Sequence, residues 1–235
     1  MDAISEFLQP YKGIVSAAAG FATIAQFFSG AFVCNDIRKA GSAEKFPFLP
    51  FIGGTVFGVL GLQYGVILRD ETMIPVNLVG LALNIMYVCF FYLYTPPHLK
   101  NNIWFQTGIG GACSAAVVAY VQWEDEDLVE TRFGLILTAL MVYLVSAPLL
   151  DLGTIVRNKS VEGLPFAIIL SGTVVSFLWL LHGFIIHNAI MVMQNLFFFV
   201  LSAFQLSLFA IYPSKPPQSN AANPQVAKKQ QDNNL

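Results

Sequence analysis

Charged side chains are scarce in this sequence, and their scarcity sets its class. Of the 235 residues only 11% are Asp, Glu, Lys or Arg, whereas 56% are hydrophobic. A soluble domain carries about a quarter charged residues, so the composition indicates a membrane protein. The few basic residues sit in short loops and form no patch, which sets nucleic-acid binding aside.

Several chemical signatures are missing too. No Asp, Glu, Lys or Arg lies deep within an apolar run, where proton- or sodium-coupled carriers usually place a carboxylate. The sequence has no GxxxxGK[ST] loop for nucleotide phosphates, and neither GxSxG nor paired aspartates inside the runs. Cys34, Cys89 and Cys113 lack CxxC spacing and a paired histidine, so we interpret them as small buried apolar side chains. We therefore predict no enzyme, cofactor or metal, and passive movement of a neutral polar solute.

Seven apolar runs are long enough to cross a bilayer, which needs about 20 residues. They lie near residues 11–34, 46–68, 73–94, 103–122, 132–155, 164–187 and 189–212. No basic segment precedes the first run, so we expect it to be retained as a helix. The segment after Pro213 is rich in Pro, Asn, Gln and Lys, which predicts a disordered tail.

The distribution of Lys and Arg predicts the orientation. With the N-terminus outside, nine of the 12 basic residues fall in the inner loops and tail and three in the outer segments. Positive charge is enriched on the cytoplasmic side of membrane proteins. We expect an outer N-terminus and a cytoplasmic C-terminus.

An internal repeat organises the chain. Shifting the sequence by 118 residues aligns SAEKFPFLPFIGGTV with SVEGLPFAIILSGTV, and 18 of the 58 positions between residues 37 and 94 are identical. Self-similarity at a fixed period indicates a duplication. Because each three-helix unit crosses the membrane an odd number of times, a linker helix must restore the orientation of the second unit.

The predicted fold is therefore an all-α membrane protein with seven transmembrane helices in a 3-1-3 arrangement. Two parallel three-helix repeats are joined by an inversion-linker helix whose glycines and alanines suit close packing. We place the first repeat at residues 1–95, the linker helix and an acidic outer loop at 96–128, the second repeat at 129–213, and the tail at 214–235.

The repeat pairs two asparagines inside apolar runs, Asn77 and Asn195. A polar side chain in a membrane helix is a functional candidate because it is costly unless it faces a wet cavity or the protein interior. A carboxamide donates and accepts hydrogen bonds, which matches the hydroxyls of a sugar. The alternative is that each asparagine bonds a neighbouring helix and only holds the bundle together.

The sixth run adds an aromatic candidate. Trp179 can pack on the C–H face of a sugar, and Ser176 and His182 flank it at spacings of three. We expect His182 to be a packing residue. Gly61 is the repeat equivalent of Trp179 and could widen the cavity opposite it, or belong to a close-packing stripe of glycines on the second helix.

Movement between two states needs hinges, and the repeat supplies four candidates. Pro47 is equivalent to Pro165, and Gly30 is equivalent to Pro148. Proline permits a kink by removing a backbone hydrogen bond, and glycine permits bending. We expect these four positions to form a gate at one depth, with a static kink as the alternative.

These features together resemble the SWEET family of sugar facilitators, in its animal branch. The resemblance rests on the duplication, on APLLDLGTIVRNKSVEGLPF and LWLLHG, on an asparagine sixteen residues after Trp179, and on the closing AIYP. It implies a uniporter of mono- or disaccharides, such as glucose, trehalose or sucrose, that works by alternating access and often forms homo-oligomers. It also implies sugar binding by Asn77 and Asn195 and a proline gate, from which Gly30 departs.

Two other functions stay open. A PQ-loop transporter of another small solute would carry a Pro-Gln pair at a helix, whereas both Pro-Gln pairs here lie in the tail. A seven-helix trafficking receptor would have longer and more basic cytoplasmic loops. We expect the plasma membrane, with a possible Golgi or other intracellular pool.

Overall fold

The computed structural model describes residues 2–158, 161 and 166–212. The elements in this part of the chain are helices: α1 (Asp2–Leu8), η1 (Gln9–Tyr11), α2 (Lys12–Phe27), α3 (Ser29–Ala40), α4 (Leu49–Ile67), α5 (Met73–Tyr94), η2 (Pro97–Leu99), α6 (Lys100–Tyr120), α7 (Glu126–Asn158), α8 (Phe166–Ile185) and α9 (Ala189–Ile211). The predicted all-α class is confirmed. The predicted disordered tail lies outside the described residues.

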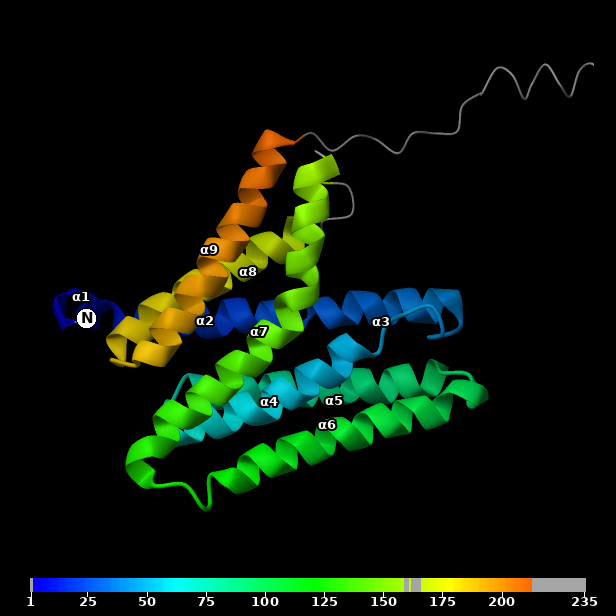
Figure 1. Ribbon diagram of the computed structural model, residues 1–235, viewed down its shortest axis with the longest axis horizontal. Helices are drawn as coiled ribbons and strands as arrows, with labels where there is room; N and C mark the ends of the chain where they lie inside the picture. Colours follow the sequence, from blue (N-terminus) through cyan, green and yellow to red (C-terminus); the bar gives the residue numbers. More distant parts are fainter. Residues whose placement is uncertain (1, 159–160, 162–165, 213–235) are drawn as a thin grey trace, which may run out of the picture.

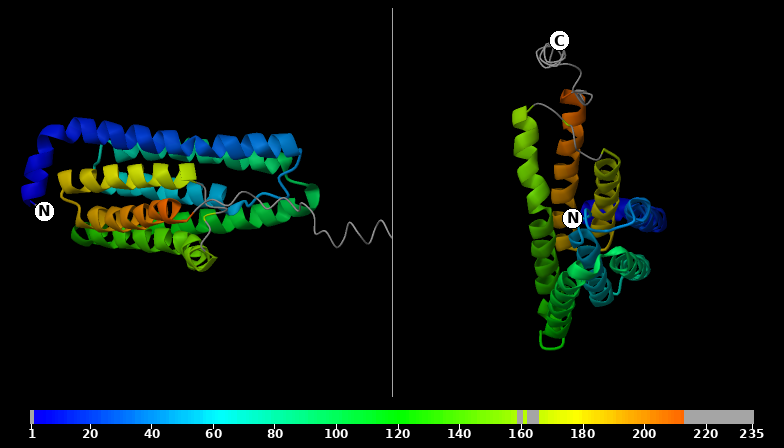
Figure 2. Two further views of the ribbon diagram at one scale, coloured as in Figure 1. Left: turned by 90° about the horizontal axis from the view of Figure 1, so that it is seen from above. Right: turned by 90° about the vertical axis from the view of Figure 1, so that its right-hand side faces the viewer.

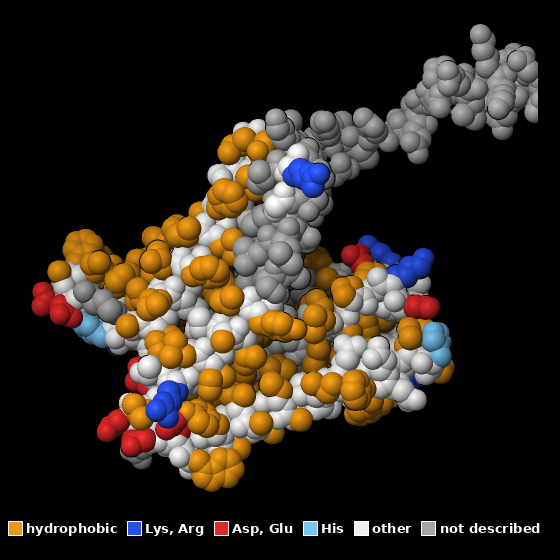
Figure 3. All heavy atoms as spheres, in the orientation of Figure 1, with side chains coloured by type: hydrophobic (Ala, Val, Ile, Leu, Met, Phe, Trp, Pro, Cys, Tyr) orange, Lys and Arg blue, Asp and Glu red, His pale blue; other side chains and the backbone are white. Residues whose placement is uncertain are grey.

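Most of these helices are suited to a bilayer. Five helical stretches are long and apolar enough to cross one: Asp2–Ala40, α4, α5, α8 and α9. The two remaining predicted runs fold as α6 and α7, with 21 and 33 residues, which at 1.5 Å per residue are also long enough to span the hydrocarbon core. On the face shown in Figure 3, apolar side chains cover the flanks and charged ones gather toward the ends.

The helices form two halves, α2 to α5 and α7 to α9, with α6 packed along α4 (Figures 1 and 2). Across the halves, α2 packs against α8 and α4 against α7. These two contacts are equivalent under the repeat, since α2 corresponds to the first part of α7 and α4 to α8. The halves are thus related by the pseudo-twofold axis that a parallel 3-1-3 arrangement requires.

The bundle has two ends, which we name by the chain termini. The N-terminal end holds α1 and the loops before α5, α7 and α9, and the C-terminal end holds the last turns of α3, α5 and α9. The helices of both halves converge at the N-terminal end. Toward the C-terminal end α7, α8 and α9 diverge from α3, α4 and α5 (Figure 1).

The glycine stripe of α4 consists of Gly54, Gly58, Gly61 and Gly65, and it packs against α5. A Cβ at Gly58 would lie 3.1 Å from the Leu81 Cα, and one at Gly65 would lie 3.0 Å from the Met73 Cβ. The stripe therefore lets the two backbones approach closely, as predicted. The linker helix follows this only in part. A Cβ at Gly110 would lie 3.0 Å from Ile52 Cγ1 on α4, whereas added Cβ atoms at Gly108 and Gly111 would meet no atom within 4 Å.

The prediction for the cysteines was only partly right. Cys34 is buried in the core of the first half, but Cys89 and Cys113 are exposed, and all three are free thiols. Cysteine tolerates an apolar lipid environment as well as a protein core. An apolar run therefore does not distinguish a cysteine that faces lipid from one that faces protein.

Candidate functional site

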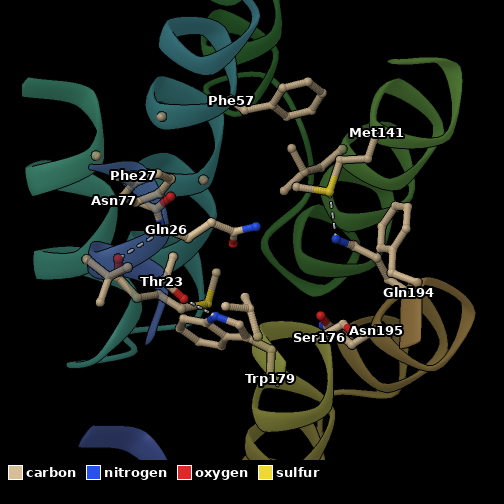
Figure 4. A pocket seen from close by; sticks show the side chains of 18 of the residues that line it. Thr23, Gln26, Phe27, Phe57, Asn77, Met141, Ser176, Trp179, Gln194 and Asn195 are labelled. Atoms are coloured by element: carbon tan, nitrogen blue, oxygen red, sulfur yellow. Dashed lines mark hydrogen bonds between the residues drawn. The ribbon is translucent and has the colours of Figure 1, made fainter. Parts of the chain in front are cut away.

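The five residues predicted to contact a solute line one cavity between the halves. Its volume is about 400 Å³, and its walls include Asn77, Asn195, Trp179, Ser176 and Gly61. Figure 4 shows Asn77 and Asn195 on opposite sides of it. The described lining residues carry no formal charge. A site of this size and character suits a small neutral molecule.

The two asparagines have the same local geometry. Asn77 Nδ2 donates to the Met73 carbonyl at 2.9 Å, and Asn195 Nδ2 donates to the Met191 carbonyl at 2.9 Å. Each bond spans one helical turn and holds the carboxamide in one orientation. Each carboxamide has a second N–H that this bond does not use.

Gly61 makes room for Asn77. A Cβ at Gly61 would overlap Asn77 Oδ1, and a Cβ at Gly54 would overlap Asn84 Oδ1 in the same way. Seven residues separate the two glycines on α4, and seven separate the two asparagines on α5. Both interpretations of Gly61 apply, because it belongs to the close-packing stripe and also lines the cavity.

Trp179 is held by a contact between the halves. Its indole N–H donates to Thr23 Oγ1 on α2 at 2.8 Å, and the Thr23 hydroxyl donates to the Ala19 carbonyl at 2.7 Å. This pair fixes the plane of the indole ring at the cavity wall (Figure 4). Ser176 is buried and donates to the Thr173 carbonyl at 3.1 Å, so its hydroxyl is already engaged.

Sequence reasoning missed six polar side chains of the same cavity: Thr23, Gln26, Tyr64, Asn84, Gln194 and Ser202. Gln194 lies against the wall of the second half, where its Oε1 accepts from Thr138 Oγ1 at 2.8 Å and its Nε2 lies 2.8 Å from Met141 Sδ. One signal was present in the sequence, because Asn84 follows Asn77 by seven residues and therefore shares its helix face.

Several hydrogen bonds join the halves at the N-terminal end, and two of them lie at equivalent positions of the repeat. Asn188 Nδ2 donates to Tyr64 Oη at 3.1 Å, and His182 Nε2 donates to Asp70 Oδ2 at 2.7 Å. Tyr64 and His182 are repeat equivalents, and so are Asp70 and Asn188. Ser16 Oγ lies 3.1 Å from the other ring nitrogen of His182, which agrees with the predicted packing role of this fully buried histidine.

The Asp70 carboxyl lies in the loop between α4 and α5. Burial alone would raise its pKa, but hydrogen bonds from His182 and from the backbone N–H groups of Met73 and Thr72 lower the pKa below its ordinary value. The carboxylate form is therefore favoured where the two halves meet. Among the described residues, no three His, Cys, Asp or Glu side chains converge as a metal site.

Two of the hinge candidates, Gly30 and Pro47, are not among the residues that line the cavity. Gly30 follows the break at Phe28 between α2 and α3, and a Cβ there would overlap the Tyr87 ring. Pro47 is exposed in the loop before α4, so it cannot kink that helix from within. Pro148 lies on α7, and Pro165 lies outside the described residues.

Comparisons with known proteins agree with this geometry. The sequence model of a family described as "Sugar efflux transporter for intercellular exchange" matches twice, at residues 13–99 and 131–217. The two matches are offset by 118 residues (131 − 13 and 217 − 99), which is the repeat found in the sequence. Together they cover more than half of the chain.

Individual relatives support the same family. The chain is 29% identical to "Sugar transporter SWEET1" of Drosophila pseudoobscura pseudoobscura, over 86% of this chain and 90% of the relative. It is 29% identical to "Sugar transporter SWEET1" of Caenorhabditis elegans, over 85% of this chain and 65% of the relative. A solved structure of a eukaryotic SWEET transporter has a TM-score of 0.78 at 24% identity, covering 87% of this chain and 97% of that one. This likeness confirms the predicted fold with seven transmembrane helices.

Proposed function

Because this chain belongs to the SWEET family of sugar transporters, we propose that it is a facilitative, energy-independent uniporter for mono- or disaccharides. It would work by alternating access between its two three-helix halves. Glucose is the first candidate substrate, followed by trehalose and sucrose.

One observation carries this proposal. Two asparagines at equivalent positions of the repeat have the same hydrogen bonds and lie on opposite sides of one uncharged cavity. Paired carboxamides can bind hydroxyls from both sides of a sugar ring, and the Trp179 ring offers a face for its C–H groups. Gly61 contributes by leaving space for Asn77.

The two ends of the bundle support alternating access. The halves are joined by hydrogen bonds at the N-terminal end and diverge at the other end. An opposite state would need these bonds to break and the C-terminal ends to approach each other. The break at Phe28 next to Gly30 supplies a hinge for the first half, and Pro47, Pro148 and Pro165 are the other proposed gate positions.

The uncharged cavity argues for passive transport. A carrier that couples sugar to protons needs a titratable group that the solute pathway can reach, and the described lining residues include none with a carboxylate or an imidazole. We further propose an outer N-terminus, a cytoplasmic C-terminus, a plasma-membrane location with an intracellular pool, and a homo-oligomer in the bilayer.

Uptake into liposomes tests the proposal. The purified protein is reconstituted, and uptake of labelled glucose, trehalose, sucrose and arginine is measured with and without a pH gradient. We expect sugar uptake that a gradient does not drive and that Asn77→Ala or Asn195→Ala abolishes. Sugar uptake that persists in both variants would refute the site, and gradient-driven arginine uptake would favour a PQ-loop transporter.

A further inference from the structure

The cavity contains a second layer of polar side chains. Asn84 follows Asn77 by seven residues on α5, and Ser202 follows Asn195 by seven residues on α9. Seven residues are almost two helical turns, so each pair shares a face and its members are about 10 Å apart along the helix. Asn84 and Ser202 are themselves 118 residues apart. The second layer is therefore related by the same repeat as the first.

The polar groups of this layer are only partly used by the protein. Asn84 Nδ2 donates to the Gly80 carbonyl at 2.8 Å, and its Oδ1 lies beside Gly54. Neither the Gln26 carboxamide nor the Ser202 hydroxyl has a hydrogen-bond partner among the side chains and backbone that the structure describes. Both residues are half-buried, and both line the cavity.

Gln26 and Ser202 both lie close to the backbone of Gly172, which has no side chain of its own to cover it. Gln26 Nε2 and Ser202 Oγ each lie 3.9 Å from the point where a Cβ on Gly172 would sit. Three helices, α2, α8 and α9, thus bring a carboxamide, a hydroxyl and a glycine surface together. In Figure 4 the Gln26 side chain reaches into the open centre of the cavity.

This arrangement suits a sugar ring. Uncharged donors and acceptors that face a wet cavity without a protein partner can exchange water for ligand hydroxyls, and glycine lets a ring approach the backbone. A ring held between Asn77 and Asn195 leaves the second layer facing water. A second ring linked to the first would extend into it.

We propose that Gln26, Asn84 and Ser202 form a second hydroxyl-binding layer, which holds the second ring of a disaccharide whose first ring lies between Asn77 and Asn195. The inference rests on the proposed sugar transport. It assigns the chain to two-ring sugars and makes Gln26 a residue that determines specificity. The repeat equivalent of Gln26 is Leu144, so this contact comes from one half only.

Calorimetric binding of glucose, trehalose and sucrose to the purified full-length protein tests the proposal. Gln26→Met keeps the length of the side chain and removes its hydrogen bonds, and Ser202→Ala removes only the hydroxyl. We expect each variant to weaken binding of at least one disaccharide by about three- to tenfold relative to glucose, the loss of one uncharged hydrogen bond. Asn77→Ala should weaken binding of all the sugars that bind.

Two matched controls lie outside the cavity. Gln106→Met is on α6, and Ser207→Ala is on the exposed side of α9; both should leave the ratio of disaccharide to glucose affinity unchanged. The proposal is overturned if the wild-type protein binds glucose but neither disaccharide, or if Gln26→Met and Ser202→Ala leave the ratio unchanged. Failure of the wild-type protein to bind or move any sugar would instead overturn the proposed function, and the second layer with it.

Discussion

Among the hydrogen bonds that join the two halves of the chain at the N-terminal end, two lie at equivalent positions of the repeat but differ in chemistry. One joins Tyr64 of the first half to Asn188 of the second, and both groups are neutral. The other joins His182 of the second half to Asp70 of the first, and both groups are ionisable. The repeat has kept a polar contact across the halves while exchanging the groups that make it.

The helix caps show what stays constant. Asp70 Oδ1 accepts from the Met73 N–H at the start of α5, and Asn188 Oδ1 accepts from the Met191 N–H at the start of α9, each at 2.7 Å. Either side chain can cap a helix. The duplicated backbone thus needs an oxygen at this position, and the second atom of each side chain is free to reach across the halves.

Breaking the ionisable contact between Asp70 and His182 should lower the stability of the fold more than any other change considered. Asp70→Ala deletes the cap of α5, worth about 0.5–2 kcal/mol, and leaves the buried His182 N–H without a partner, which costs about 1–3 kcal/mol. We expect a destabilisation of about 2–4 kcal/mol and a thermal midpoint lower by on the order of 5–10 °C. Thermal unfolding of the purified protein in detergent measures it.

The neutral side supplies the control for that experiment. Asn188→Ala removes the matching cap and also the hydrogen bonds from Asn188 Nδ2 to the buried Tyr64 hydroxyl and to Glu130. Because it breaks no bond between two ionisable side chains, we expect its midpoint to fall by less. Equal losses in the two variants would show that the ionisable pair stabilises the protein no more than the neutral contact does.

Acid should weaken the same contact. Because the pKa of Asp70 is lowered in the folded protein, its carboxylate contributes stability above the ordinary carboxyl pKa of about 4. That contribution is lost as the pH falls through the lowered pKa. The gap in thermal midpoint between wild type and Asp70→Asn should therefore narrow from pH 7 to pH 3.

Other carboxylates do not contribute to the difference in thermal midpoint between the two proteins. A hydrogen bond from Arg132 lowers the pKa of Glu124, but Glu124 is present in both proteins and its titration cancels in the difference. A gap that stays constant with pH would mean that Asp70 is not the titrating group.

A second contrast between the halves is the space at Gly61, where the other half has Trp179. Gly61→Ala places a Cβ on Asn77 Oδ1, so the carboxamide must leave its bond to Met73. We expect sugar uptake to fall about tenfold or more, which corresponds to about 1.4 kcal/mol. Gly108→Ala, whose Cβ meets no atom within 4 Å, is the matched control. If Gly61→Ala took up sugar at the wild-type rate, the orientation of the Asn77 carboxamide would not be needed for transport.

The sequence predicted the features that depend on periodicity. Apolar runs of about 20 residues gave the helices, and the 118-residue repeat paired Asn77 with Asn195. Asp70 and Asn188 are also 118 residues apart, as are Tyr64 and His182. Their contacts were not predicted, because each joins non-equivalent positions of different halves. Contacts across a pseudo-twofold axis depend on how the halves dock, which periodicity within a helix does not specify.

The remaining misses have local physical causes. The apolar run near residues 46–68 predicts Pro47 within a helix, but α4 begins at Leu49. Pro50 occupies the first turn of α4, a position that proline favours. Gln26 was not predicted because its repeat equivalent, Leu144, is apolar. Comparing the two repeats identifies positions that are polar in both halves, so it does not identify a polar residue that only one half contributes.

The smallest expected effect on sugar affinity is at Gln194. Only one half contributes a polar residue at this position, and replacing it tests whether Gln194 binds solute or only packs against its own half. Its equivalent in the first half is Val76, and Gln194 already bonds Thr138 and lies against Met141. Gln194→Val makes the two halves alike there and leaves Thr138 Oγ1 its 2.8 Å bond to the Gly134 carbonyl. We therefore expect sugar affinity to change by less than about threefold, within the range of one weak hydrogen bond. Val76→Gln in the other half is the reciprocal variant, and calorimetry measures both. A loss of tenfold or more in Gln194→Val alone would place Gln194 among the sugar ligands and make the cavity more asymmetric than the paired asparagines suggest.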